Sequence, residues 1–171
     1  MLTYVKIFGY LIIFSFIYSK SEIQFSANIL ENLVEDNIEK RIFRDDVIIK
    51  KDNMILFTDE AIYIPSESKV ILNKDVKMYD QLDSLKCDNL ILYDSDYKEF
   101  NAFGDVTFYK NSQIIKSEYM EMLENPTVST TKINLYNNAQ LVDLNRTVSG
   151  DTLYVSYLDS LVEKMKIISN A

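Results

Sequence analysis

Apolar and polar residues alternate one by one along most of this chain, and this pattern predicts β-strands with one face turned to a core. After Asp46, for example, the pattern places Val47 and Ile49 on one face and Ile48 on the other. The same alternation restarts three more times, after Asp75, Asp105 and Asn138. We therefore expect an all-β fold, with no helix beyond the N-terminal segment.

The alternating segments form an internal repeat with two landmarks. The first is the Asp or Asn that precedes each alternation, at positions 46, 75, 105 and 138, and the second is an acid that follows it at a constant spacing. The acid column consists of Asp59, Asp88, Glu118 and Asp151, so both landmarks advance in step. A shared period of about 30 residues predicts stacked β repeats.

Differences in repeat length fall in one kind of place. The segments 70–92, 100–122 and 133–155 are equally long, whereas the connections 63–70, 92–100 and 122–133 become longer along the chain. Turn-forming residues fill these connections, at 65–68, 94–96 and 124–127. A second set of turns is predicted inside the repeats, at 52–53, 80–81, 110–112 and 145–146.

The hydrophobic pattern changes phase at the acid column. Leu56 and the small residue Thr58 precede Asp59 on one phase, and Ala61 follows it on the other. Because a slip of one residue turns every later side chain to the opposite face, the backbone must bulge or bend there. We expect a structural corner at Asp59, Asp88, Glu118 and Asp151, with about four short strands per repeat in two facing antiparallel sheets. Residues 23–30 form half a repeat before the first full copy.

Composition excludes most catalytic and metal chemistry. The chain has no His, which removes the usual general base and the commonest zinc ligand. Its single Cys, Cys87, occupies the small-residue column and is expected to be a buried small side chain. No nucleophile–base pair can be assembled, so we expect neither an enzyme nor a cofactor. A calcium site at the acid column is disfavoured because the Gly-Asp-rich loops of calcium-binding repeats are missing.

The N-terminus reads as a targeting segment. One positive charge precedes an apolar run from Ile7 to Tyr18, and Ser19 and Ser21 fit a cleavage site before Glu22. We expect residues 1–21 to be a signal peptide and residues 22–171 to be the exported domain; an uncleaved membrane anchor is the alternative. Cleavage would remove two lysines and no acid, which changes the net charge from −8 to about −10. That charge predicts repulsion from nucleic acid and from anionic lipid surfaces.

The repeat resembles that of the OstA-like (organic solvent tolerance-like) family. The segment from Phe100 to Val106, followed by 116–120, is similar to that family's Gly-Asn-Val or Gly-Asp-Val turn and small-Asp-apolar strand. The match recurs at 72–76 with 87–90 and at 148–153, and it covers residues 23–171. Only Gly104 keeps the turn glycine; the other positions hold Asp45, Lys74 and Asn137, of which Lys74 tolerates left-handed backbone least.

The resemblance implies a fold and a function. Family members include periplasmic proteins that carry lipopolysaccharide to the outer membrane, on an open, twisted β-jellyroll that stacks head to tail. Acyl chains would then lie between the sheets, with lipopolysaccharide, further copies and related jellyroll domains at the inner and outer membranes as partners. The implied lipid-groove residues are Val47, Ile49, Leu56, Tyr63, Val76, Met78, Leu85, Leu92, Val106, Phe108, Ile115, Met120 and Met122.

Two alternative functions remain open from the sequence. The apolar columns also suit a ligand-free structural β-solenoid of the cell envelope. The same fold would serve a membrane-anchored docking component of the transport pathway.

Four tyrosines, Tyr63, Tyr93, Tyr119 and Tyr154, suggest an aromatic ladder whose ordinary role is packing. Counting four to five rungs at ~4.8 Å each gives an expected length of ~20–25 Å for one copy.

Overall fold

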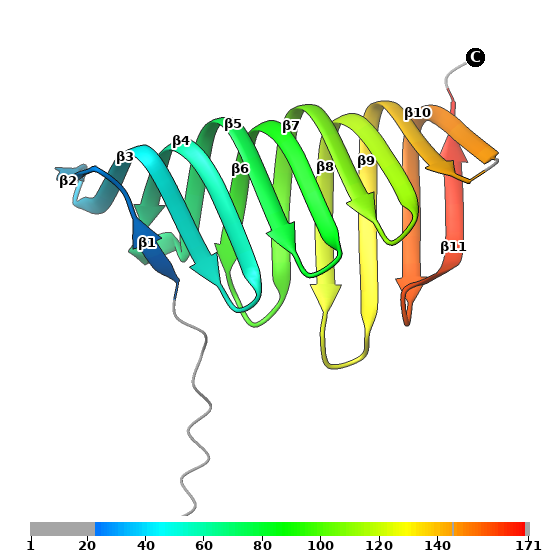
Figure 1. The fold of residues 1–171 in the computed structure, drawn as a ribbon, viewed down its shortest axis with the longest axis horizontal. Coiled ribbons are helices and arrows are strands. Elements are labelled where there is room, and N and C mark those ends of the chain that lie inside the picture. The colour runs from blue at the N-terminus through cyan, green and yellow to red at the C-terminus, as the bar shows by residue number, and fades with distance from the viewer. Residues whose placement is uncertain (1–22, 145, 170–171) are drawn as a thin grey trace, which may run out of the picture.

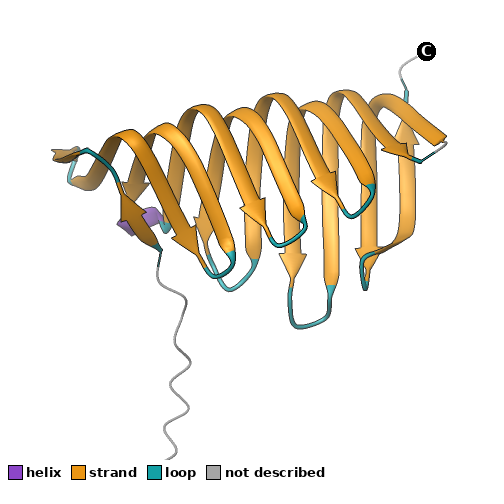
Figure 2. Cartoon of the chain, in the orientation of Figure 1, coloured by secondary structure: helices purple, strands orange, loops and turns teal. Residues whose placement is uncertain are grey.

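The computed structural model describes residues 23–144 and 146–169. The predicted signal segment, residues 1–21, lies outside the described residues, as do Asn145 of one predicted turn and Ala171. The described chain forms strands joined by short turns, with one 3-10 turn, η1 (Pro65–Glu67) (Figure 2). The all-β prediction is confirmed.

One antiparallel sheet contains all eleven strands, as Figure 1 shows. Ten of them follow one path, β1-β3-β4-β5-β6-β7-β8-β9-β10-β11, and β2 pairs with β3 beside β1. The strands are β1 (Gln24–Ser26), β2 (Ile29–Glu35), β3 (Ile38–Lys51), β4 (Met54–Ile64), β5 (Lys69–Asp80), β6 (Asp83–Asp94), β7 (Lys98–Lys110), β8 (Gln113–Asn125), β9 (Thr130–Asp143), β10 (Arg146–Leu158) and β11 (Leu161–Ile168). The predicted turns at 52–53, 65–68, 80–81, 94–96, 110–112 and 124–127 fall at the junctions between these strands.

Each long strand pair contains an irregularity at the same place. On β3, Arg44 and Val47 pair with Glu60 and Thr58 of β4, so that the two residues between them oppose the single residue Asp59. Two-against-one pairing is a β-bulge, which bends the strand. The two-residue sides are 45–46, 74–75, 104–105 and 137–138, and all of these residues have positive φ. The left-handed backbone expected at Asp45, Lys74, Gly104 and Asn137 is confirmed.

The bends fold the sheet over on itself. Phe100 and Phe108 both belong to β7, and a straight strand would separate two such positions by ~26 Å. Their ring centroids are 6.4 Å apart. Strand β7 therefore doubles back at its bulge, and Figure 1 shows the other long strands curving over along the same line.

Two halves of the sheet result from this line of bends. We call the segments 24–26, 47–58, 76–87, 106–117, 139–144 and 146–150 the front half, which faces the viewer in Figure 1. The rear half consists of 29–44, 60–73, 89–103, 119–136 and 152–168. Inward side chains of both halves join one hydrophobic cluster that runs from Phe43 to Tyr157.

Two expectations about the strands were wrong. The sequence suggested four short strands per repeat, but each repeat contains two long strands that continue through the bend. A bulge shifts the hydrophobic phase in the sequence just as a loop does, but it leaves the hydrogen-bonded ladder intact on both sides. The predicted length of ~20–25 Å counted one rung per repeat. Ten strands lie along the path, and spaced ~4.8 Å apart they span ~43 Å.

Candidate functional site

The predicted groove residues come together in the interior. Twelve of the thirteen are at most 2% exposed, and they come from both the front and the rear half. Tyr63 is the exception: it is half-buried and packs against the cluster, 5.3 Å from the Phe25 ring between centroids. No member of the cluster carries a charge. Alternation placed these side chains on the inward face, and the bends turn that face toward itself.

The interior is a packed core in this structure. Phe108, Met120 and Met78 have no exposed surface. A lipid would enter only if the two halves moved apart and its acyl chains replaced contacts between side chains. What holds the halves together opposite the bends therefore decides whether the interior can admit a ligand.

Opposite the bends, turns of the front half meet turns of the rear half along a line that we call the mouth. Lys51, at the end of β3, lies 3.4 Å from Asp94 Oδ1 and donates to the carbonyls of Tyr93 (3.3 Å) and Ser95 (3.0 Å). Lys98 of the rear half lies 2.6 Å from Asp80 of the front half. Both lysines thus bridge the two halves through charged contacts.

The far end of the mouth is held by contacts among β6, β7, β8 and β10. Lys110 pairs with Asp83 at 3.0 Å and lies 5.8 Å from the centroid of the Tyr157 ring. The Tyr157 hydroxyl donates to Gln113 Oε1 at 2.8 Å, and burial raises the pKa of that hydroxyl, so it remains a donor. The sequence analysis missed Lys51 and Lys110. The alternation could have identified them. Lys51 lies two residues after the buried Ile49, and Lys110 two residues after the buried Phe108, so both side chains are on the inward face of their strands.

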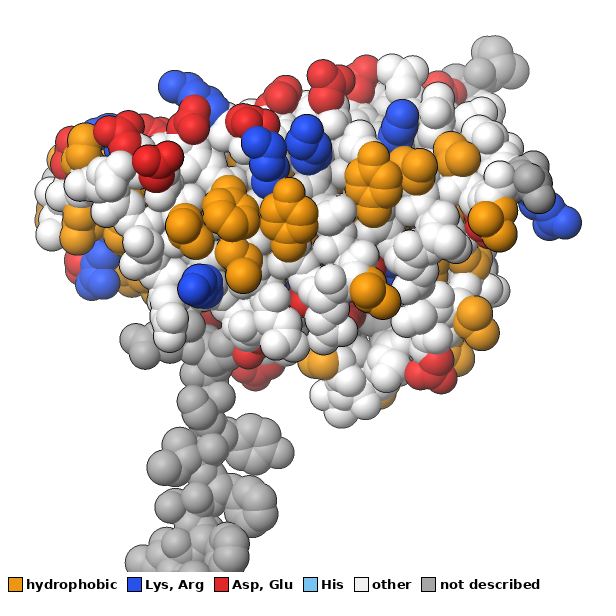
Figure 3. Space-filling view, viewed as in Figure 1, with side chains coloured by type: hydrophobic (Ala, Val, Ile, Leu, Met, Phe, Trp, Pro, Cys, Tyr) orange, Lys and Arg blue, Asp and Glu red, His pale blue; other side chains and the backbone are white. Residues whose placement is uncertain are grey.

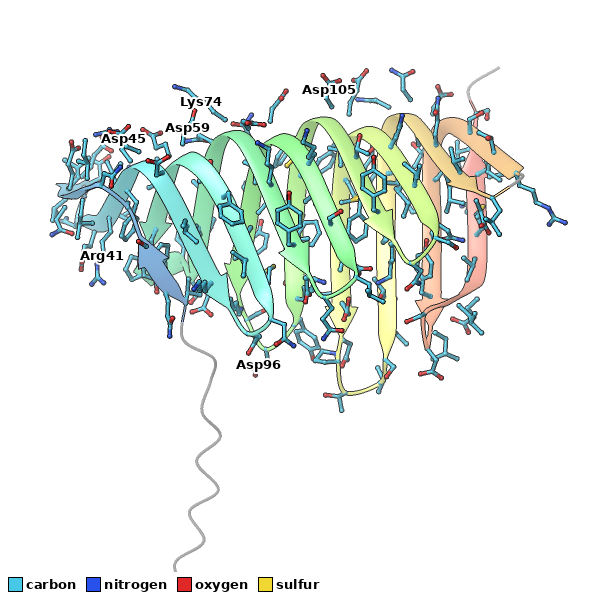
Figure 4. The ribbon with its side chains drawn as sticks, in the orientation of Figure 1. Arg41, Asp45, Asp59, Lys74, Asp96 and Asp105 are labelled. Carbon is cyan, nitrogen blue, oxygen red and sulfur yellow. The ribbon has the colours of Figure 1, made fainter. Side chains whose placement is uncertain are left out.

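A cavity of about 370 Å³ opens at the mouth. Met54 and Leu92 provide its apolar lining, and Lys51, Lys98 and four acids provide its charged lining. The four acids are Asp52, Asp80, Asp96 and Glu124. Asp96 lies at the bottom of the view in Figure 4, away from the bends at the top. Its lining comes from both halves, with Met54 and Asp80 from the front half and Leu92 and Lys98 from the rear half.

The predicted corner acids lie along the bends, each opposite a two-residue bulge. Asp59 opposes 45–46, and its exposed position at the bend is visible in Figure 4 beside Asp45 and Lys74. Glu118 accepts a hydrogen bond from the Asn138 side chain at 2.7 Å. Asp88 lies against Gly104, where an added Cβ would come within 2.1 Å of the carboxylate. Among the described residues no group of three or more metal-ligating side chains converges.

Two further predictions about single side chains have different outcomes. Cys87 is buried as expected, and burial raises the pKa of its thiol to about 12, so it remains an unreactive thiol. The aromatic ladder exists with different members. Rings stack along the outer rear face from Phe103 to Tyr119 and Tyr136, and Tyr154 meets Tyr136 edge-on. Tyr63 instead packs against the interior.

Glu121 joins two rings of this ladder. Its carboxylate accepts hydrogen bonds from the Tyr119 hydroxyl (2.7 Å), the Tyr136 hydroxyl (3.0 Å) and the Asn134 amide (3.1 Å). The Tyr119 hydrogen bond chiefly lowers the pKa of Glu121, while burial raises the pKa of Tyr136 to about 12. The network therefore holds one ionised carboxylate between two neutral tyrosines.

Within the part of the chain that the structure describes, no helix is long and apolar enough to cross a membrane. No family model matches the chain, and no curated protein matches it.

Proposed function

We propose that this chain is a non-enzymatic carrier of the bacterial cell envelope that forms part of a bridge for lipopolysaccharide. In this proposal, lipid acyl chains lie between the front and rear halves while the sugar portion stays in water. The bent sheet is then an open, twisted β-jellyroll of stacked ~30-residue repeats, and its halves act as two facing sheets. The domain works in the periplasm after export, cleaved or tethered to the inner membrane.

One observation carries the proposal: an apolar cluster runs through the whole sheet, with the buried lysines Lys51 and Lys110 at the mouth, and the described backbone joins the two halves along the bends. At the mouth, side-chain contacts such as Lys51–Asp94 and Lys98–Asp80 hold the halves together. Such contacts can exchange for water when the halves part. Burial of each acyl methylene then contributes about 0.8 kcal/mol, which favours the bound lipid.

The interior side chains suit an irregular guest. Met78, Met120 and Met122 contribute flexible thioether chains to both halves. Methionine adapts its shape more readily than branched residues do, so it can repack around acyl chains of different length.

The two ends of the sheet fit a bridge. Strand β2 exposes Val34 (70%) at one edge, and β11 exposes Leu161 (74%) at the other. Unpaired strand edges with apolar side chains favour addition of a further strand. We propose head-to-tail contact between copies, and docking of related jellyroll domains at the ends of the array.

Photo-crosslinking tests the carrier function. A photoreactive residue at Phe108, which points inward, should capture lipopolysaccharide, whereas the same residue at Asn101, which points outward on the rear half of the same strand, should not. Phe108→Asp combined with Met120→Asp should abolish capture by a third inward probe at Ile115, provided circular dichroism shows retained strand content. Equal capture at 101 and 108, or none at either, would refute the proposal.

Two alternatives have their own readouts. A ligand-free structural solenoid predicts no copurifying lipid by mass spectrometry at any protein concentration. A membrane-anchored docking component predicts lipid capture together with an intact N-terminus. Sequencing that N-terminus separates this component from the soluble carrier, which would begin at Glu22.

A further inference from the structure

The outer surface of the front half has an unusual charge. Four lysines point outward between the bends and the mouth turns: Lys50, Lys77, Lys86 and Lys116. No Asp or Glu shares these outward positions, where the other residues are apolar, hydroxyl-bearing or Gln. We call this surface the outer front face. It is positively charged, whereas the whole chain has a net charge of −8.

A row of apolar side chains runs beside the lysines. Phe57, Tyr79 and Tyr109 are 38%, 51% and 43% exposed. Strand register continues the row through half-buried neighbours, because Ile55 pairs with Tyr79, Tyr109 with Ile114, and Ile114 with Val142. Figure 3 shows this apolar row across the middle of the face, with basic side chains along its upper side and a further basic side chain below its left part.

The lysine charges are mostly free to act on a ligand. Lys77 pairs with Asp75 at 2.9 Å. Lys50, Lys86 and Lys116 make no ion pair with any residue that the structure describes. Asp59 and Asp105, labelled in Figure 4, lie at the bend, where the sheet turns away from this face.

We propose that the outer front face docks on an anionic lipid surface. Tyrosine rings are favoured at the boundary between water and hydrocarbon, and lysines beside them attract anionic headgroups. The rings of Phe57, Tyr79 and Tyr109 lie on the same face as Lys77, Lys86 and Lys116, which follow one another across the strands in register. Repulsion expected from the net charge is overcome locally, because charges farther away than about one Debye length, ~8 Å at physiological salt, are screened.

This docking role is separate from lipid capture in the interior. It uses outward side chains of the front half, while the proposed carrier function uses inward ones. A protein could hold acyl chains in its interior without docking on a membrane. It could also dock on a membrane without holding acyl chains. The two proposals can therefore fail independently.

A single tryptophan identifies the face that touches lipid. The chain has no Trp, so Tyr79→Trp on the outer front face and Tyr154→Trp on the outer rear face each give one fluorescent reporter in the full chain. With vesicles of phosphatidylcholine and anionic phosphatidylglycerol, Tyr79→Trp should shift its emission to the blue and Tyr154→Trp should not. Vesicles of neutral phosphatidylcholine alone should leave both unchanged. Because the reporter is local, binding through the N-terminal segment does not imitate this result.

Charge reversal measures the lysine contribution. Near an anionic surface each lysine contributes about fivefold in affinity, so Lys86→Glu with Lys116→Glu in the Tyr79→Trp chain should weaken vesicle binding at least ~25-fold. Lys132→Glu with Lys166→Glu makes the same charge change on the outer rear face and should weaken binding far less. Raising the salt concentration should remove the blue shift.

Three results would overturn the docking proposal. The Tyr154 reporter shifts as much as the Tyr79 reporter, or the two double charge reversals weaken binding equally, or Tyr79→Trp shifts with protein concentration in the absence of vesicles. The last result would assign the face to a second copy of the chain. Capture of lipid by a probe at Phe108 reports on the carrier function separately in the same preparation.

Discussion

Residues in left-handed backbone fix where each strand bends. Gly104 has φ of +74°, and its α-carbon faces the Asp88 side chain so closely that a Cβ would lie 2.8 Å from the Asp88 Cβ. Lys74 holds the equivalent place in another repeat at φ of 70°. The same bend is therefore made by a residue that suits it and by one that does not.

Exchanging residues at these two equivalent positions should have opposite effects. Gly104→Ala adds a strained φ and a clash with Asp88, and should lower the free energy of unfolding by about 1–3 kcal/mol. Lys74→Gly removes a strained φ and should leave that free energy unchanged or raise it by up to about 1 kcal/mol. Urea unfolding measures both. A loss of stability from Lys74→Gly as large as that from Gly104→Ala would contradict this account.

Glu121 should make stability depend on pH. Its folded-state pKa is lowered, chiefly by the Tyr119 hydroxyl, so its contribution is present above the unfolded pKa and is lost as the pH falls through the folded pKa. The stability difference between the parent and Glu121→Gln should be present at pH ~7 and shrink between pH ~5 and ~3. Denaturant titrations at several pH values check this, and a constant difference would exclude it.

Elements meet at the mouth without sharing a backbone ladder. Lys51 of β3 and the turn after β6 are far apart in sequence, and the side chain of Lys51 joins them. Lys51→Ala removes a cation from beside the half-buried Asp94 carboxylate and should destabilise the protein by about 1–3 kcal/mol. Hydrogen exchange should rise in both turns, 51–54 and 94–98. Lys50→Ala, next to it but exposed, should change neither.

Alternation alone predicted the strands, the turns and the bends, because these depend on residues close in sequence. A bulge and a loop both break the period after Thr58, so the number of strands was misjudged. The mouth was missed for a different reason. Lys51 and Asp94 become neighbours only after β3 to β7 have each bent by a particular amount, which no local pattern encodes. Whether a ligand enters between them depends on the strength of those contacts rather than on the apolar columns.

At the scale of the whole molecule each end of the sheet is shared by two segments. At one end these are β1 in the front half and β2 in the rear half, and at the other they are residues 146–150 of β10 in the front half and β11 in the rear half. Val34→Lys or Leu161→Lys should weaken self-association at high concentration, because charge on an edge strand opposes pairing. Leu82→Lys, at an equally exposed turn (86%), is the control. Sedimentation velocity over a range of concentrations gives the answer, and a parent chain that remains monomeric throughout would remove the basis for the bridge.

The strand order has a consequence for how the protein is made. Nearly every strand pairs with the strand just before or after it in the chain, and within the described residues no pairing joins β1 to β11. Low sequence separation between partners favours rapid folding by growth from one hairpin to the next. Such a chain can fold in the order in which it emerges from a ribosome or a translocation pore. It need not wait for its last residues, and at each stage the newest strand is the template for the one that follows.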